Sequence, residues 1–237
     1  MSTSNQEKMS LRVTDYKRAG KLIGNLIYVC AALLPVTLVA SCSSVDRSRN
    51  LGNPEVPANT IAMQVCSNCH GAYGVSVSPN FPNLAAQQQP YLIAQLKSFK
   101  LHTRSDPAAS RYMWGLSSHL TDDQITGLAD YFAAQKPPTE SVEIQGSVTD
   151  GQSIFEHGIA ESNTPACSSC HGPKAEGNQI FPRLAGQHAD YIVKQLKVFQ
   201  ETDDRPDAVL MKSVSKGLTP ENMQSVALYL QAMQSVQ

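Results

Sequence analysis

An internal repeat constrains the fold of this 237-residue chain more than any other feature. The stretch CSNCHG at 66–71 recurs as CSSCHG at 167–172, and FPNLAAQ at 81–87 recurs as FPRLAGQ at 181–187. The offset stays close to about one hundred residues through each half, and two repeats are too few for a solenoid. Each repeat is long enough to form a small domain with its own core. We therefore predict two tandem domains.

Both repeats have the patterning of helical domains. In the segment 90–101 and its counterpart in the second repeat, apolar residues fall at i, i+4 and i+7, which predicts amphipathic helices. The last helix of the first repeat should begin at Thr121 with Gln124 completing a capping box, and that of the second at Thr219 with Pro220 as its first residue. We expect these two helices to bury Ile125, Leu128, Ala129, Phe132, Met223, Val226, Ala227 and Leu230. No strand is predicted.

The repeated Cys-x-x-Cys-His run indicates covalent haem attachment. Its two thiols can reach the two vinyl groups of one porphyrin while the adjacent histidine turns its imidazole onto the iron. A redox-active cysteine pair does not explain the histidine after both pairs, and a zinc site would have to join ligands about a hundred residues apart. We predict two haem c groups held by Cys66, Cys69, His70, Cys167, Cys170 and His171.

Methionine is the predicted ligand on the other side of each iron. Met113 lies 43 residues after His70 and Met211 lies 40 residues after His171, both in segments predicted to be non-helical just before the last helix. Packing in the core is the alternative for an arbitrary methionine, and is our assignment for Met223. The matched placement favours iron coordination for Met113 and Met211.

Other polar and aromatic residues are predicted to have supporting roles. His102, His119, His157 and His188 have no histidine counterpart in the other repeat. We assign His102 and His119 to solvated or capping roles and His157 and His188 to surface or packing positions, and we expect Trp114 to pack near the haem. A ligating imidazole usually donates its second N–H to an acceptor that fixes the ring. Pro82 and Pro182 follow the two histidines closely enough to present such a backbone carbonyl. A rigid turn is the alternative role for these prolines.

The N-terminus has the layout of an export signal. Five basic residues in 1–21 precede an apolar run from Leu22 to Ala40, and small residues then precede Cys42. This end of the run resembles a bacterial lipobox, so we predict a lipoprotein-type signal peptide at 1–41 and a diacylglycerol on the Cys42 thiol. An uncleaved membrane helix is the alternative. Both place the remaining chain outside the cytoplasm.

Net charge excludes one class of partner. The 19 Lys and Arg residues balance 20 Asp and Glu residues, giving a formal charge of −1. Sequence-independent binding to nucleic acid needs an excess of positive charge, so no nucleic-acid partner is expected.

Together these motifs resemble the dihaem cytochrome c4 family over about residues 58–235. The resemblance implies an all-α fold of two tandem class I cytochrome c domains, each a few helices wrapped around one covalent haem. It also implies proximal ligands His70 and His171, distal ligands Met113 and Met211, and orienting carbonyls at Pro82 and Pro182. The first repeat departs from the family pattern, because only residues 58–65 precede its first motif and its first helix should be short.

The expected organisation is a signal peptide at 1–41, a tether at 42–57, domain 1 at 58–135, a linker at 136–148 and domain 2 at 149–237. The expected function is electron transfer in the bacterial periplasm, with no catalytic residue, between a redox protein donor and an acceptor such as a terminal oxidase. A haem subunit of a membrane-bound dehydrogenase is the first alternative. A dihaem enzyme of the peroxidase or thiosulfate-oxidising type is the second, but no acid/base constellation for it is evident.

Overall fold

The structure, a computed structural model, describes residues 51–138 and 148–233. The predicted signal peptide, Cys42, most of the tether and most of the linker lie outside the described residues. Both repeats belong to one compact unit, Ser48–Gln237.

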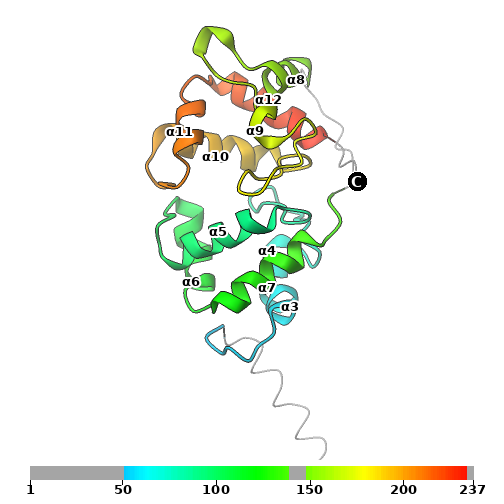
Figure 1. Ribbon diagram of the computed structural model, residues 1–237, viewed down its shortest axis with the longest axis vertical. Helices are drawn as coiled ribbons and strands as arrows, with labels where there is room; N and C mark the ends of the chain where they lie inside the picture. The colour runs from blue at the N-terminus through cyan, green and yellow to red at the C-terminus, as the bar shows by residue number, and fades with distance from the viewer. Residues whose placement is uncertain (1–50, 139–147, 234–237) are drawn as a thin grey trace, which may run out of the picture. The chain divides into compact units, whose positions relative to one another are not determined.

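Helices make up both repeats (Figure 1). The first repeat contains α3 (Ala58–Ile61), the π-helix η1 (Ala62–Cys66), α4 (Ser67–His70), α5 (Gln89–Lys100), the π-helix η2 (Ala109–Met113), α6 (Trp114–Ser117) and α7 (Asp122–Ala133). The second contains α8 (Val148–His157), the 3₁₀-helix η3 (Ala160–Ser162), α9 (Ser168–His171), α10 (Ala189–Glu201), α11 (Val209–Ser215) and α12 (Pro220–Ala232). Within the described residues the only β-type pairing is two isolated bridges, so the all-α prediction is confirmed. No helix in the described part of the chain is long and apolar enough to cross a membrane.

The last helix of each repeat begins as predicted. Thr121 Oγ1 accepts from the Gln124 backbone N–H at 3.1 Å, and Gln124 Oε1 accepts from the Thr121 N–H at 3.0 Å. Thr219 and Asn222 form the same capping box on α12, where Pro220 is the first helical residue. All eight residues predicted to be buried on these helices are exposed by 4% or less. They anchor one core cluster in each repeat.

The first and last helices of each repeat cross at a glycine. In the second repeat the glycine lies on the first helix, and in the first repeat it lies on the last helix. On α8, a Cβ added to Gly151 would lie 2.1 Å from the carbonyl oxygen of Ser225 on α12. On α7, a Cβ added to Gly127 would lie 2.7 Å from the Ala58 Cβ of α3. As expected, α3 is short, with four residues. It runs on through η1 into α4, and Ile61 is buried at 1% exposure.

The segments that carry Met113 and Met211 correct one prediction. Both were expected to be non-helical, but Met113 ends the π-helix η2 and Met211 lies in the seven-residue helix α11. Helices this short present too few turns for a hydrophobic period to be read from sequence. Tertiary packing therefore decides their conformation.

Candidate functional site

An apolar cavity of about 670 Å³ runs through both repeats. Among its lining residues are all eight that the sequence analysis assigned to haem binding: Cys66, Cys69, His70, Met113, Cys167, Cys170, His171 and Met211. The structure thus brings together residues that are separated in sequence by up to 47 positions within one repeat, from Cys66 to Met113.

Both motif histidines are fixed by a backbone carbonyl. His70 Nδ1 lies 2.9 Å from the Pro82 oxygen, and His171 Nδ1 lies 2.8 Å from the Pro182 oxygen. A carbonyl oxygen can only accept, so each Nδ1 carries the proton and each Nε2 keeps a free lone pair. Burial lowers the pKa of His70 and His171 from the ordinary value, and the hydrogen bond to the proline carbonyl partly opposes this shift. The neutral imidazole that a metal requires is therefore the favoured form.

A glycine lets the chain turn away directly after each histidine. Gly71 has φ +76°, and a Cβ there would lie 2.1 Å from the Val75 carbonyl oxygen. Gly172 repeats this conformation with φ +82°. A phenylalanine ring packs edge-on against each imidazole, Phe81 at a centroid distance of 6.1 Å and Phe181 at 6.3 Å. The rings of the histidines are therefore held by packing as well as by hydrogen bonds.

The first cysteine of each motif is a poor redox-active thiol. Burial raises the pKa of Cys66 to about 11, and burial likewise raises the pKa of Cys167 to about 11. Reactive cysteine pairs work as thiolates with lowered pKa values. The environment of these thiols therefore does not favour a disulfide-exchange motif.

Met113 and Met211 are half-buried on the cavity wall. The Ser117 hydroxyl donates to the Met113 carbonyl at 2.5 Å. Trp114 corrects a prediction, because it is not among the cavity residues. It is 44% exposed and stacks on His102 at a centroid distance of 5.1 Å, since a residue one position along the helical segment from Met113 points elsewhere.

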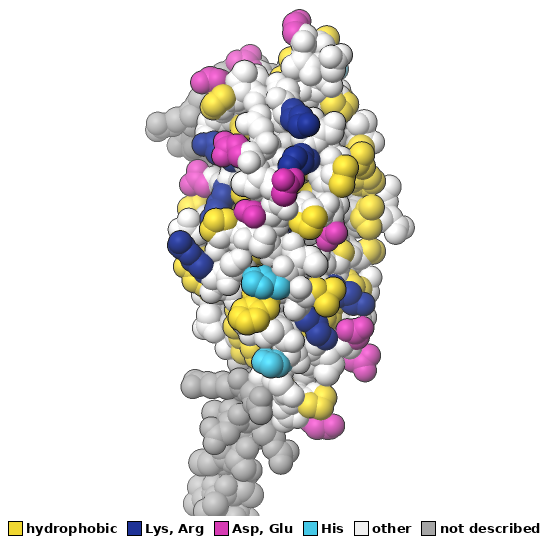
Figure 2. Space-filling model, turned by 90° about the vertical axis from the view of Figure 1, so that its left-hand side faces the viewer, with side chains coloured by type: hydrophobic (Ala, Val, Ile, Leu, Met, Phe, Trp, Pro, Cys, Tyr) yellow, Lys and Arg dark blue, Asp and Glu magenta, His cyan; other side chains and the backbone are white. Residues whose placement is uncertain are grey.

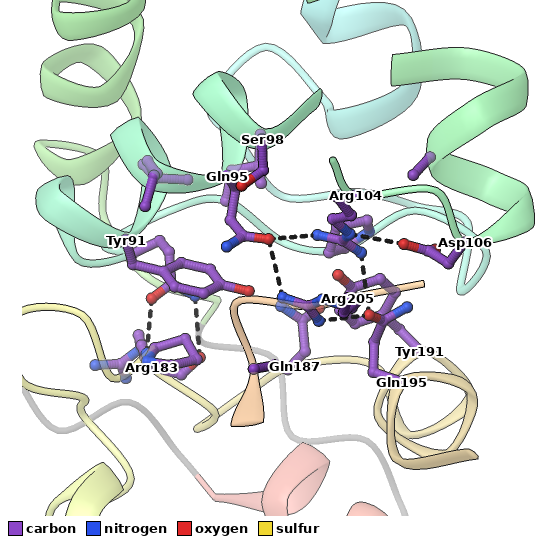
Figure 3. A pocket seen from close by; sticks show the side chains of 18 of the residues that line it. Tyr91, Gln95, Ser98, Arg104, Asp106, Arg183, Gln187, Tyr191, Gln195 and Arg205 are labelled. Carbon is purple, nitrogen blue, oxygen red and sulfur yellow. Dashed lines mark hydrogen bonds and ion pairs between the residues drawn. The ribbon is translucent and has the colours of Figure 1, made fainter. Parts of the chain in front are cut away.

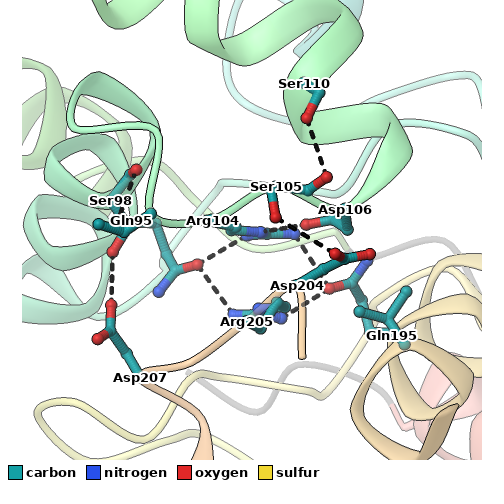
Figure 4. A network of polar contacts seen from close by, with 12 residues as sticks. Gln95, Ser98, Arg104, Ser105, Asp106, Ser110, Gln195, Asp204, Arg205 and Asp207 are labelled. Atoms are coloured by element: carbon teal, nitrogen blue, oxygen red, sulfur yellow. Dashed lines mark hydrogen bonds and ion pairs between the residues drawn. The ribbon is translucent and has the colours of Figure 1, made fainter. Parts of the chain in front are cut away.

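Where the two repeats meet, two arginines lie between two glutamines (Figures 3 and 4). Arg104 donates to Gln95 at 2.7 Å and to Gln195 at 3.0 Å. Arg205 donates to the same two Oε1 atoms, at 2.9 Å for Gln95 and 2.6 Å for Gln195. Arg104 also pairs with the buried Asp106 at 2.7 Å. Each arginine thus joins its own repeat to the other.

A second pair of glutamines, Gln87 and Gln187, joins the two repeats at the same boundary, which we call the seam. Gln87 and Gln187 are each 6% exposed, and both side-chain amides bond to the backbone of the other repeat. Sequence analysis assigned no role to the seam glutamines or arginines. The available signal was that Gln87 and Gln95 recur in the second repeat as Gln187 and Gln195.

The lining of the cavity fits the predicted cofactor. Its walls are mainly apolar, and arginines stand at the seam. In the described part of the chain, Arg183 Nε is a buried donor without a hydrogen-bond partner, and Arg183 lines the cavity. A flat apolar macrocycle with acidic side groups would fill such walls and supply an acceptor to this donor. The residues present therefore suit haem.

Charged side chains on the outer surface form no single-sign patch on the face that Figure 2 shows. Basic and acidic residues are interspersed there, and histidine side chains lie beside hydrophobic ones. Exposed His119 and His157 fit the predicted surface positions. His188 packs at the seam, where its Nε2 lies 3.0 Å from the Ser76 carbonyl oxygen.

Comparisons with known proteins agree with the tandem arrangement. The model of the family described as Cytochrome c matches residues 56–136 and again 148–234. Cytochrome c-552 of Acidithiobacillus ferridurans is 39% identical over 78% of this chain and 81% of its own length. A protein named thiosulfate dehydrogenase electron acceptor, from Thiomonas intermedia, is 33% identical over 70% of this chain and 77% of its own length. The solved structure of Acidithiobacillus ferrooxidans cytochrome c4 is 42% identical and covers 70% of this chain and 98% of its own, with a TM-score of 0.66.

Proposed function

The chain belongs to the cytochrome c family, as a dihaem electron carrier of the cytochrome c4 group, and from this premise we propose that it carries electrons in the bacterial periplasm between a respiratory donor and an acceptor such as a terminal oxidase. Two haem c groups supply one-electron redox chemistry when bound. The protein's part is to hold, orient and shield them.

We assign the covalent attachment to Cys66, Cys69, Cys167 and Cys170, and the axial positions to His70 with Met113 and His171 with Met211. The observation that carries this assignment is the shared cavity: the four thiols, two imidazoles and two thioethers all line it. Because each histidine already donates through Nδ1, its Nε2 is the atom left to bind iron. With Met113 and Met211 as the second ligands, no open coordination site would remain for a substrate, which supports electron transfer rather than bond chemistry.

Attachment to the membrane is the second part of the proposal. The lipobox-like sequence before Cys42 supports cleavage there and lipidation of its thiol, which would tether the carrier to a membrane surface. An intact-mass measurement of protein purified from its own membranes tests this. A mass matching residues 42–237 plus lipid supports the tether, whereas the full-length mass would support an uncleaved helix.

The donor is a redox protein, and one comparison bears on its class. The relative from Thiomonas intermedia bears the name thiosulfate dehydrogenase electron acceptor. We therefore keep a dehydrogenase as a candidate donor, either as a transient partner or as a permanent assembly in which this chain is the haem subunit. Co-purification of the native protein under mild detergent separates these two arrangements.

Single methionine variants test the ligand assignment. Met113→Ala and Met211→Ala should each open one iron, so that carbon monoxide binds one haem per molecule and the other haem stays six-coordinate. Met223→Ala is the matched control, because that side chain is buried at 1% exposure in the core and is not among the cavity residues. Carbon monoxide binding by the control, or its absence in the other two variants, would reject the assignment.

A further inference from the structure

The carbonyl that holds each motif histidine belongs to a peptide group whose N–H is bound by the other repeat. In the first repeat this peptide joins Pro82 to Asn83: its oxygen accepts from His70 Nδ1 at 2.9 Å, and its N–H donates to Gln187 Oε1 at 2.8 Å. Gln187 comes from the second repeat. A continuous chain of two hydrogen bonds therefore runs from His70 through one peptide group to a glutamine of the other repeat.

The second repeat has the same arrangement, with the roles of the two repeats exchanged. The peptide that joins Pro182 to Arg183 accepts from His171 Nδ1 at 2.8 Å, and its N–H donates to Gln87 Oε1 at 2.7 Å. Gln87 comes from the first repeat. Each repeat thus supplies the glutamine at the end of the hydrogen-bond chain that starts at the other repeat's histidine.

The orientation of both glutamine amides is fixed by their partners. Gln187 Nε2 donates to the Asn83 carbonyl at 2.9 Å, and Gln87 Nε2 donates to the Arg183 carbonyl at 3.0 Å. A carbonyl cannot donate, so in each amide the oxygen is the atom that faces the peptide N–H. Both glutamine side chains are buried, which keeps water from replacing these contacts.

Hydrogen bonds in such a chain strengthen one another. An acceptor on the N–H side of a peptide polarises the group and makes its carbonyl a better acceptor, by about 10–30% per bond in condensed-phase estimates. A stronger bond at Nδ1 makes an imidazole a more electron-donating ligand, and this second layer of contacts is one of the controls on haem potential. The effect at His70 therefore depends on a side chain of the second repeat.

We propose that Gln187 and Gln87 are reciprocal positioning residues: Gln187 sets the hydrogen bond and electron donation of His70, and Gln87 those of His171. Each iron is then tuned by the opposite repeat, so that loss of both glutamine contacts changes both reduction potentials. This inference rests on the proposed function, because it takes His70 and His171 as the iron ligands.

Gln187→Leu in the holoprotein tests the proposal, with two readouts. The first is the Nδ1–H proton signal of each histidine in the reduced, diamagnetic state, measured by NMR with nitrogen-labelled histidine. Gln187→Leu should move the His70 signal upfield and leave the His171 signal in place. The second is a potentiometric titration of the first-repeat haem. At a fixed potential its ratio of reduced to oxidised haem should rise about threefold, which equals an increase of about 28 mV in its one-electron reduction potential.

Adjacent residues provide the matched controls. His188 crosses the same seam but contacts the Ser76 carbonyl, and Gln88 Nε2 donates to the Glu176 carbonyl at 2.9 Å. Neither peptide holds a motif histidine. His188→Leu and Gln88→Leu remove a cross-repeat contact of similar kind and should leave both Nδ1–H signals and both potentials unchanged.

Three outcomes would overturn the proposal: a folded Gln187→Leu protein with an unchanged His70 signal, a shift at His171 instead, or an equal shift in His188→Leu. If Gln187→Leu does not fold, Gln87→Leu applies the same test to His171. Failure of the proposed function is a separate result, since it would be seen in the unmodified protein as the absence of histidine and methionine coordination.

Discussion

Phe155 is the side chain whose loss should most weaken the second repeat. It is fully buried at 0% exposure and packs against Tyr229 with ring centroids 5.7 Å apart, where α8 crosses α12. Truncation of a buried phenylalanine to alanine costs about 3–5 kcal/mol, because the contacts are lost and the cavity closes only in part. With a denaturant slope of about 4 kcal/mol/M in guanidinium chloride, Phe155→Ala should lower the unfolding midpoint of this repeat by about 1 M.

Two probes separate the repeats in this experiment. Trp114 is the single tryptophan of the chain and lies in the first repeat, so its fluorescence follows that repeat, whereas far-ultraviolet circular dichroism follows both. All core residues around Phe155 belong to the second repeat. The circular dichroism transition should therefore gain an early phase while the Trp114 transition moves less. Phe155→Leu, which keeps most of the volume, should lose only about 1 kcal/mol.

A loss below about 1 kcal/mol in Phe155→Ala would refute the reasoning that this crossing anchors the second repeat. A Trp114 transition that moves as far as the early phase would refute the separation of the two cores.

Three further substitutions test the packing, the seam and a helix cap. Gly151→Ala should lower the thermal midpoint by several degrees, since the added Cβ would lie 2.1 Å from the Ser225 carbonyl oxygen. Gln187→Leu should cost about 1–3 kcal/mol in denaturant unfolding, because it leaves the buried backbone groups of Asn83 without partners. Thr219→Ala should cost about 1 kcal/mol in the same assay, because it removes the acceptor that caps α12.

Each of these has a control within the chain. For Gly115→Ala, the added Cβ has no atom within 4 Å, so the thermal midpoint should not fall. Gln88→Leu removes one cross-repeat hydrogen bond, from a half-buried side chain, and should cost less than Gln187→Leu. Thr126→Ala alters an exposed threonine inside α7 and should change stability by less than about 0.5 kcal/mol. A control that loses as much stability as its partner variant would contradict the local explanation for that partner.

Long helices could be predicted from the sequence because their signals are local. The capping box at Thr121 lies within four residues, and the apolar stripe from Ile125 to Phe132 covers about two turns. The same is true of Pro82 and the histidine it holds, which are 12 residues apart. Short helices gave no such signal, so the conformation around Met211 was predicted wrongly.

The contacts across the seam between the repeats could not be predicted from the sequence. Contacts such as that between Asn83 and Gln187 join residues 104 positions apart, and nothing in the local pattern encodes them. The recurrence of Gln87 and Gln95 as Gln187 and Gln195 is also explained by the repeat alone, so it does not by itself indicate contacts between the repeats. Trp114 was misplaced for a related reason, because adjacency to Met113 in sequence does not determine which way a helical side chain points.

Absorption spectroscopy of the mature holoprotein, oxidised and reduced, with and without carbon monoxide, tests the central claim most directly. Two low-spin c-type haems, a weak far-red band of methionine-to-iron coordination in the oxidised state and no carbon monoxide binding are predicted, because the proposal assigns Met113 and Met211 to the sixth positions. Absence of the far-red band, or rapid carbon monoxide binding at one haem, would contradict the account. At least one methionine would then not be a ligand, and an open iron would favour an enzyme over a carrier.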